Sequence, residues 1–158
     1  MDKTPMTLRS HKASTEELQR LKSIERKKAS DAIAEARAHG DISENAEYEA
    51  AKDAQGMLEA KIRLLESRLG TAQVIDVSKL TGDKVLFGAT VTFEDLDSGE
   101  SKTVMIVGED EADADAGLIS YVSPLARALI GKSVDDLVQV KLPNGTKEYE
   151  IRAVEFKE

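Results

Sequence analysis

Two long segments that favour helix constrain this chain most. Residues 14–38 contain no Gly or Pro and are rich in Glu, Lys, Arg and Ala, which are good helix formers. A second helix is predicted from about Glu44 to about Ala72. Its apolar residues recur at alternating spacings of four and three, as in a coiled coil: Leu58, Ile62, Leu65, Leu69 and Ala72. Because only a few residues join the two helices, we expect them to fold back antiparallel.

The limits of the first helix are predicted from its flanking residues. Ser14 and Glu17 match a capping box, which predicts a helix start at Ser14. Gly40 stands where a left-handed residue would end the helix. The expected apolar stripe is Leu18, Leu21, Ile24, Ala29, Ala32, Ile33 and Ala36. At a rise of 1.5 Å per residue, the hairpin would be about 40 Å long.

After Asp76 the sequence changes to short apolar runs that are typical of β-strands. The runs are residues 85–93, 103–107, 118–122, 137–142 and 149–154. Two turn sequences, Asp97-Ser98-Gly99 and Pro143-Asn144-Gly145, predict hairpins. Ser123-Pro124 opens a short predicted helix over residues 125–130. The fold class is therefore α+β, with a coiled-coil hairpin over residues 1–77, a linker over 78–84 and a small α+β domain over 85–158.

Composition excludes several classes of protein. The net charge is −8, and it is uneven: residues 1–78 hold 13 Lys/Arg and 14 Asp/Glu, whereas residues 79–158 hold 9 and 16. This balance argues against ordinary duplex binding and restricts any nucleic-acid contact to the first half. The chain has no cysteine, and no run of about 18 apolar residues. We expect no membrane contact and, without a secretory signal, a cytoplasmic location.

The predicted turn carries the residues with the clearest chemistry, Asp41 and Glu44. Their spacing is also that of a helix cap, and capping is the simpler interpretation of the spacing alone. However, carboxylates bind Mg²⁺, which proteins often hold with one or two carboxylates plus waters and phosphates. Two carboxylates at the end of a helical hairpin are a poor metal site alone. They would suit a site completed by another enzyme.

Motifs along the chain resemble one protein family. Residues 33–55, IAEARAHGDISENAEYEAAKDAQ, resemble the hairpin tip of the bacterial transcript cleavage factors GreA and GreB, and are closer to GreA. Further similar segments are AQVIDVSKL (72–80), FGATVT (87–92), IVGEDEAD (106–113) and ISYVSPLARALIGK (119–132). The resemblance extends over nearly the whole chain.

This resemblance implies a function. The C-terminal domain would have an FKBP-like fold and dock at the rim of the RNA polymerase secondary channel, and the hairpin would enter the channel. Asp41 and Glu44 would help hold a Mg²⁺ ion shared with polymerase and orient a water. Polymerase would then cleave the 3′ end of backtracked nascent RNA. The factor itself would be no enzyme, would bind no metal alone and would be monomeric when free.

The resemblance also assigns binding residues. Arg37 and Lys52 match the family's basic patch and would contact RNA; their alternative is a solvated helix face. Ser123 and Pro124 match the polymerase-docking loop, and we expect them to cap the short helix as well. Four positions depart from the usual family pattern: Ser10, Ser14, Lys27 and Glu49.

Rival functions are less consistent with the residues. An independent hydrolase would need a nucleophile–base pair, a phosphate loop or a complete metal site, and none is evident in the sequence. A prolyl isomerase would need an aromatic-lined pocket, but the chain has no Trp and three Phe. A non-cleaving relative that inhibits polymerase would not need the Asp41/Glu44 pair. A plain coiled-coil adaptor would not explain the acidic turn.

Overall fold

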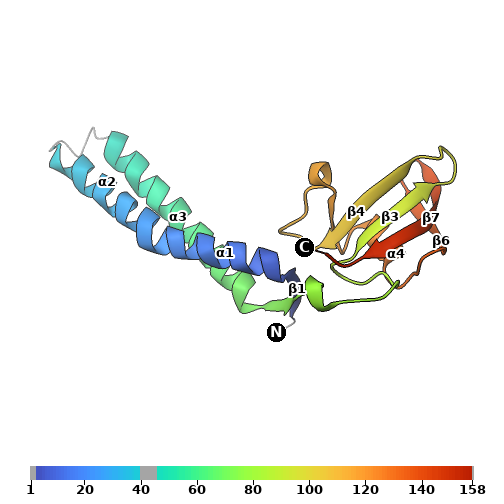
Figure 1. Ribbon diagram of the computed structural model, residues 1–158. Coiled ribbons are helices and arrows are strands. Elements are labelled where there is room, and N and C mark those ends of the chain that lie inside the picture. Colours follow the sequence, from blue (N-terminus) through green and yellow to red (C-terminus); the bar gives the residue numbers. More distant parts are fainter. Residues whose placement is uncertain (1–2, 40–45, 158) are drawn as a thin grey trace. The chain divides into compact units, whose positions relative to one another are not determined.

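The computed structural model describes residues 3–39 and 46–157 of the chain (Figure 1). Within these residues the chain forms two compact units. One is made by His11–Ala72, and the other combines Lys3–Ser10 with the chain from Gln73 onward. The N-terminal segment therefore belongs to the same unit as the C-terminal half. The fold class is α+β, as predicted: a helical hairpin followed by a small sheet domain.

The hairpin consists of one long helix that contains a π-helical turn and one regular α-helix (Figure 1). The first is made of α1 (Leu8–Arg20), a π-helical turn η1 (Leu21–Glu25) and α2 (Arg26–Ala38). The second is α3 (Ala46–Gly70). The two run antiparallel, because Lys22 pairs with Glu66 and the later residue Arg26 pairs with the earlier residue Glu59. The predicted antiparallel hairpin is confirmed.

The first helix begins earlier than predicted, and the expected capping box at Ser14 is wrong. The Thr7 hydroxyl caps the helix instead, because it accepts a hydrogen bond from the Ser10 backbone N–H at 3.1 Å. Thr7 is buried and donates its own proton to Glu111 Oε1 at 2.6 Å. Ser14 lies inside α1. No Gly or Pro lies between Thr7 and Ser14, so the helix extends back to the earlier cap.

The π-helical turn explains a second departure from the prediction. The Arg26 N–H donates to the Leu21 carbonyl, five residues back, and the Ser23 hydroxyl donates to the Gln19 carbonyl at 2.7 Å. Such a turn holds one extra residue and rotates the side chains that follow. Ile24 is consequently 49% exposed, although it was predicted in the buried stripe. Ala32, also predicted there, is exposed too.

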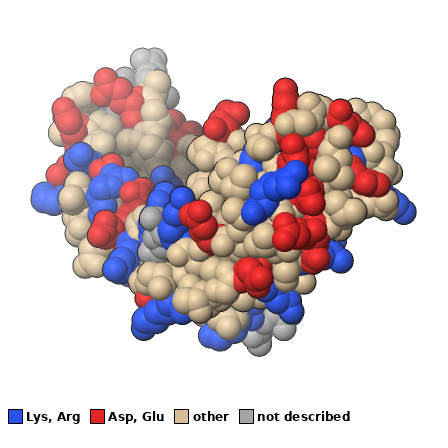
Figure 2. All heavy atoms as spheres, turned by 45° about the vertical axis from the view of Figure 1, so that its right-hand side comes forward, with Lys and Arg blue, Asp and Glu red and all other residues tan. Residues whose placement is uncertain are grey.

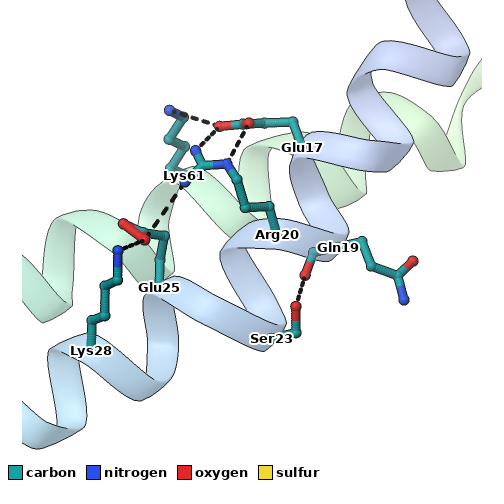
Figure 3. Close-up of polar contacts among 7 residues, drawn as sticks. All are labelled: Glu17, Gln19, Arg20, Ser23, Glu25, Lys28 and Lys61. Carbon is teal, nitrogen blue, oxygen red and sulfur yellow. Dashed lines mark hydrogen bonds and ion pairs between the residues drawn. The ribbon is translucent and has the colours of Figure 1, made fainter.

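Charged side chains cross the π-helical turn on one flank of the hairpin (Figure 3). Arg20 contacts Glu17 at 2.7 Å and Glu25 at 3.6 Å, and Lys28 contacts Glu25 at 3.5 Å. Lys61 of α3 contacts Glu17 at 3.5 Å. These contacts join the segments before and after the turn to each other and to the second helix.

The predicted seam of α3 is confirmed over most of its length. Ile62 is 1% exposed, and Leu58, Leu65 and Leu69 are half-buried. The helix ends at Gly70, however, so Ala72 lies in the next strand rather than in the seam.

That strand belongs to a small sheet that the sequence did not indicate. β2 (Ala72–Ile75) pairs with β1 (Thr4–Thr7). A 3₁₀ turn, η3 (Val77–Lys79), follows, and Val77 is fully buried. Gly88 lies against Val77 with φ +88°, and a Cβ there would come within 2.7 Å of Val77 Cγ2. Glycine is therefore required at position 88.

The main sheet has five strands in the order β5-β4-β3-β7-β6 (Figure 1). They are β3 (Thr90–Asp95), β4 (Ser101–Val107), β5 (Leu118–Ser120), β6 (Leu137–Leu142) and β7 (Gly145–Glu155). A 3₁₀ turn, η4 (Ala114–Ala116), precedes β5. The pairs are antiparallel except β4–β5, which is parallel. The predicted five strands and two hairpin turns are confirmed, but the segment from Val85 to Ala89 lies outside β3.

One short helix, α4 (Pro124–Leu129), covers the core of this domain. Ala126 and Leu129 are fully buried in a cluster with Phe93, Ile106 and Ile151 of the sheet. The ring of Phe93 packs edge to face on Tyr149, with centroids 4.8 Å apart. The helix and the residues that open it are thus held on a rigid core.

Candidate functional site

The acidic pair predicted from the sequence, Asp41 and Glu44, lies outside the described residues. α2 ends at Ala38 and α3 begins at Ala46, so both carboxylates belong to the segment that connects the two helices. Their contribution to a metal site or to a helix cap stays a prediction.

The helix ends beside this segment are joined by an arginine and a tyrosine. Arg37, near the end of α2, places its guanidinium carbon 5.6 Å from the centroid of the Tyr48 ring in α3. Its Nη2 donates a hydrogen bond to the Tyr48 hydroxyl at 3.4 Å. A guanidinium over an aromatic face is attracted by the electron-rich ring. Arg37 is exposed, whereas Tyr48 is half-buried.

Lys52 lies one turn after Tyr48 on α3, and its charge affects the pKa of the Tyr48 phenol. The hydrogen bond from Arg37 lowers the pKa of the Tyr48 phenol, and burial opposes it; the positive charges of Arg37 and Lys52 lower this pKa further. The negative charge of Glu49 raises the pKa of Tyr48. Of the two predicted RNA-contact residues, Arg37 therefore contacts Tyr48, and Lys52 affects the same phenol through its charge.

A second contact between the helices lies closer to the connecting segment. His39 Nδ1 is 3.1 Å from Glu47 Oε2, and both side chains are more than half exposed. The contact is an ion pair only when the imidazole is protonated. It nevertheless places the end of α2 beside the first turn of α3.

The predicted docking residues belong to the other unit and open α4. Ser123 Oγ accepts a hydrogen bond from the Ala126 N–H at 3.2 Å, and Pro124 follows at the first helical position. The capping role of Ser123 is confirmed. Pro124 is exposed. Beyond the helix lies a shallow hollow lined by Arg127, Ile130, Lys132 and Leu137, among others.

The face drawn in Figure 2 carries both basic and acidic side chains, in several small groups. Among residues 3–39 and 46–157, no three His, Asp or Glu side chains gather as metal ligands. No helix in the described part of the chain is long and apolar enough to cross a membrane.

Comparison with known proteins covers both units. Residues 4–74 match the family described as "Transcription elongation factor, N-terminal", and residues 80–156 match "Transcription elongation factor, GreA/GreB, C-term". The chain is 55% identical over 156 residues to a protein of Phenylobacterium zucineum named transcription elongation factor GreA. It is 56% identical over 156 residues to one of Beijerinckia indica with the same name. Each alignment covers 99% of both chains. The chain belongs to the GreA/GreB family of transcription elongation factors.

The predicted family is thereby confirmed. Among solved structures, the GreA factor homolog 1 of Thermus thermophilus is 28% identical, with a TM-score of 0.44 over 97% of this chain and 99% of that one. Tyr48 is a residue beside the site that the sequence analysis did not single out. An aromatic residue four positions after Glu44 and four before Lys52 was the available signal, because such spacings share a helix face.

Proposed function

We propose that this GreA/GreB family member binds RNA polymerase and stimulates endonucleolytic cleavage of backtracked nascent RNA. The hairpin enters the secondary channel, and the sheet domain docks at the channel rim. Polymerase remains the nuclease, and this chain supplies carboxylates to its active centre. One observation carries the proposal: Asp41 and Glu44 stand in the sequence between α2 and α3, the two antiparallel helices of the hairpin.

The donor set fits a shared Mg²⁺ site. Two carboxylates suit a hard cation, and polymerase would supply the remaining ligands. When bound, the metal would supply an activated water and stabilise developing negative charge. Asp41 and Glu44 would bind the cation together with polymerase and orient the water.

Basic residues near the facing ends of α2 and α3 support a role for the hairpin at the RNA 3′ end. Arg37 is exposed, and Lys52 lies close enough to Tyr48 to act on the same ring. Cations at this position would attract the phosphates of the extruded RNA segment. Docking would rest on Pro124 and its surroundings in the other unit.

The decisive experiment separates metal binding from helix capping. Asp41→Asn keeps a good cap, because Asn and Asp cap helices about equally well, but it removes the negative charge. Glu44→Gln likewise removes the negative charge and keeps the cap, because Gln also serves in a capping box. Each variant is tested for cleavage of the RNA in a halted, backtracked elongation complex, and for competition with the unchanged protein for polymerase.

We expect both variants to fold and to bind polymerase, but to lose about 10²–10³ in stimulated cleavage rate, comparable to losing one transition-state contact. High Mg²⁺ should restore part of the rate. Stimulation within a few-fold of the unchanged protein for both variants would instead leave capping as the role of these carboxylates. The purified protein with RNA and Mg²⁺ but no polymerase should show no cleavage.

A further inference from the structure

The contact between Arg37 and Tyr48 differs from the contacts of three other arginines in the described part of the chain. Arg20, Arg26 and Arg152 each pair with a carboxylate. Within the described residues, Arg37 forms no such pair. Its partner is a phenol ring, which orients the guanidinium without cancelling its charge. The positive charge of Arg37 therefore remains available to an anion.

The position of Tyr48 determines where that charge is held. Tyr48 is in the first turn of α3, and Arg37 is in the last turn of α2, so the contact bridges the two helices beside residues 40–45. Lys52 is four residues after Tyr48 and on the same face of α3. Arg37 thus contacts the ring of Tyr48, and the charge of Lys52 also acts on the Tyr48 phenol.

An unrestrained arginine on a solvated helix would sample many rotamers. Contact with the ring face and with the hydroxyl restricts the guanidinium to one side of the hairpin. A group held in place before binding loses less conformational entropy when it binds. Tyr48 would therefore raise the affinity of Arg37 for phosphate without touching the phosphate itself.

We propose that Tyr48 is a positioning residue that holds the Arg37 guanidinium beside Lys52, so that both cations bind the phosphates of the extruded RNA as one site. This inference rests on the proposed function, because it takes RNA as the ligand of Arg37. It adds a requirement that the family match does not supply: an aromatic ring at position 48.

The contact itself is tested first, in the free protein. The phenol of Tyr48 is titrated by NMR in protein labelled with ¹³C at the tyrosine ring. Arg37→Ala should raise the pKa of Tyr48, because the hydrogen bond and charge that lower it are removed. Lys27→Ala is the matched control, since Lys27 is an exposed cation on the same helix that pairs with Asp31. An unchanged Tyr48 pKa in Arg37→Ala would overturn the inference and leave the proposed function intact.

The functional consequence is tested in the polymerase complex. A photoreactive nucleotide at the RNA 3′ end of a backtracked transcript reports contact with the factor. Tyr48→Leu should lower crosslinking about two- to five-fold at sub-saturating factor, the change expected for one exposed cation–π contact. Tyr48→Phe should retain most of the crosslinking because it keeps the ring. Equal losses for Leu and Phe would exclude positioning through the ring.

The combined variant decides whether Tyr48 acts through Arg37. In an Arg37→Ala background, Tyr48→Leu should cause no further loss of crosslinking. Losses that multiply would overturn the proposal by showing that Tyr48 contacts RNA independently. Full crosslinking by Arg37→Ala alone would instead contradict the RNA contact in the proposed function. Helix content, measured by circular dichroism, should be the same in all variants.

Discussion

At the scale of single residues, Thr7 joins segments that are distant in sequence. Its hydroxyl oxygen accepts the Ser10 N–H that needs a cap, and its proton goes to Glu111 in the acidic run after β4. A Cβ at Gly108, just before that run, would approach the Pro5 carbonyl oxygen at 3.1 Å. The acidic run, which its composition alone presents as a solvated loop, is therefore tied to the start of the chain.

This arrangement predicts a clear effect of removing the Thr7 hydroxyl. Thr7→Val keeps the shape of the buried side chain but loses both hydrogen bonds. We expect the free energy of unfolding to fall by about 1–3 kcal/mol, from a lost helix cap and an unpaired buried group. Urea unfolding followed by circular dichroism measures the change. Thr7→Ser, which keeps the hydroxyl, should retain most of the stability, and equal losses in the two variants would refute the capping role.

At the scale of elements, two isoleucines that were both predicted to be buried differ in exposure because of the π-helical turn. Ile62 is 1% exposed in the hairpin interface, whereas Ile24 is 49% exposed. Ile62→Ala should cost about 2–5 kcal/mol in the free energy of unfolding, because it leaves a cavity. Ile24→Ala should cost no more than about 1 kcal/mol. Similar losses at the two positions would show that the stripe is not rotated in solution.

A second prediction for the hairpin concerns pH. Arg26 donates two hydrogen bonds to Glu59, at 2.8 and 2.9 Å, and these lower the pKa of that carboxyl below its ordinary value of 4.5. A lowered pKa stabilises the folded state above pH 4.5, and this stabilisation is lost as the pH falls through the folded-state pKa. Unfolding midpoints of the unchanged protein and of Glu59→Gln should therefore differ most near neutral pH. The difference should shrink below about pH 4.5, and a gap that widens there would contradict the assignment.

At the scale of the whole molecule, the residues proposed for docking and those proposed for RNA contact belong to different units. Pro124 is exposed at the start of α4, while Ser123 caps the same helix. Pro124→Ala should keep α4, because Ala is a good helix former, and should weaken polymerase binding. The free energy of unfolding of Pro124→Ala, compared with that of the unchanged protein, is the control for the stability of α4. Competition for polymerase measures the effect.

Substitutions in the hairpin should give a different result in the same competition assay. Arg37→Ala combined with Lys52→Ala should leave polymerase competition nearly unchanged but reduce crosslinking to the RNA 3′ end. If this pair weakened polymerase binding more than Pro124→Ala does, the main affinity would lie in the hairpin rather than in the sheet domain.

The sequence by itself determined the family, the α+β class and the antiparallel hairpin, because these follow from periodicity, turn residues and motifs that are local in the chain. It also placed β6 correctly, and the seam of α3 as far as Leu69. Only the tertiary structure decided the start of the first helix, since the choice of Thr7 over Ser14 depends on the distant Glu111. The rotation of the apolar stripe on the first helix likewise depends on the extra residue in the π-helical turn. The spacing of apolar residues in the sequence does not reveal that residue. The partner of Arg37 is a residue of the opposite helix, and local patterns do not specify how two helices align side chain to side chain.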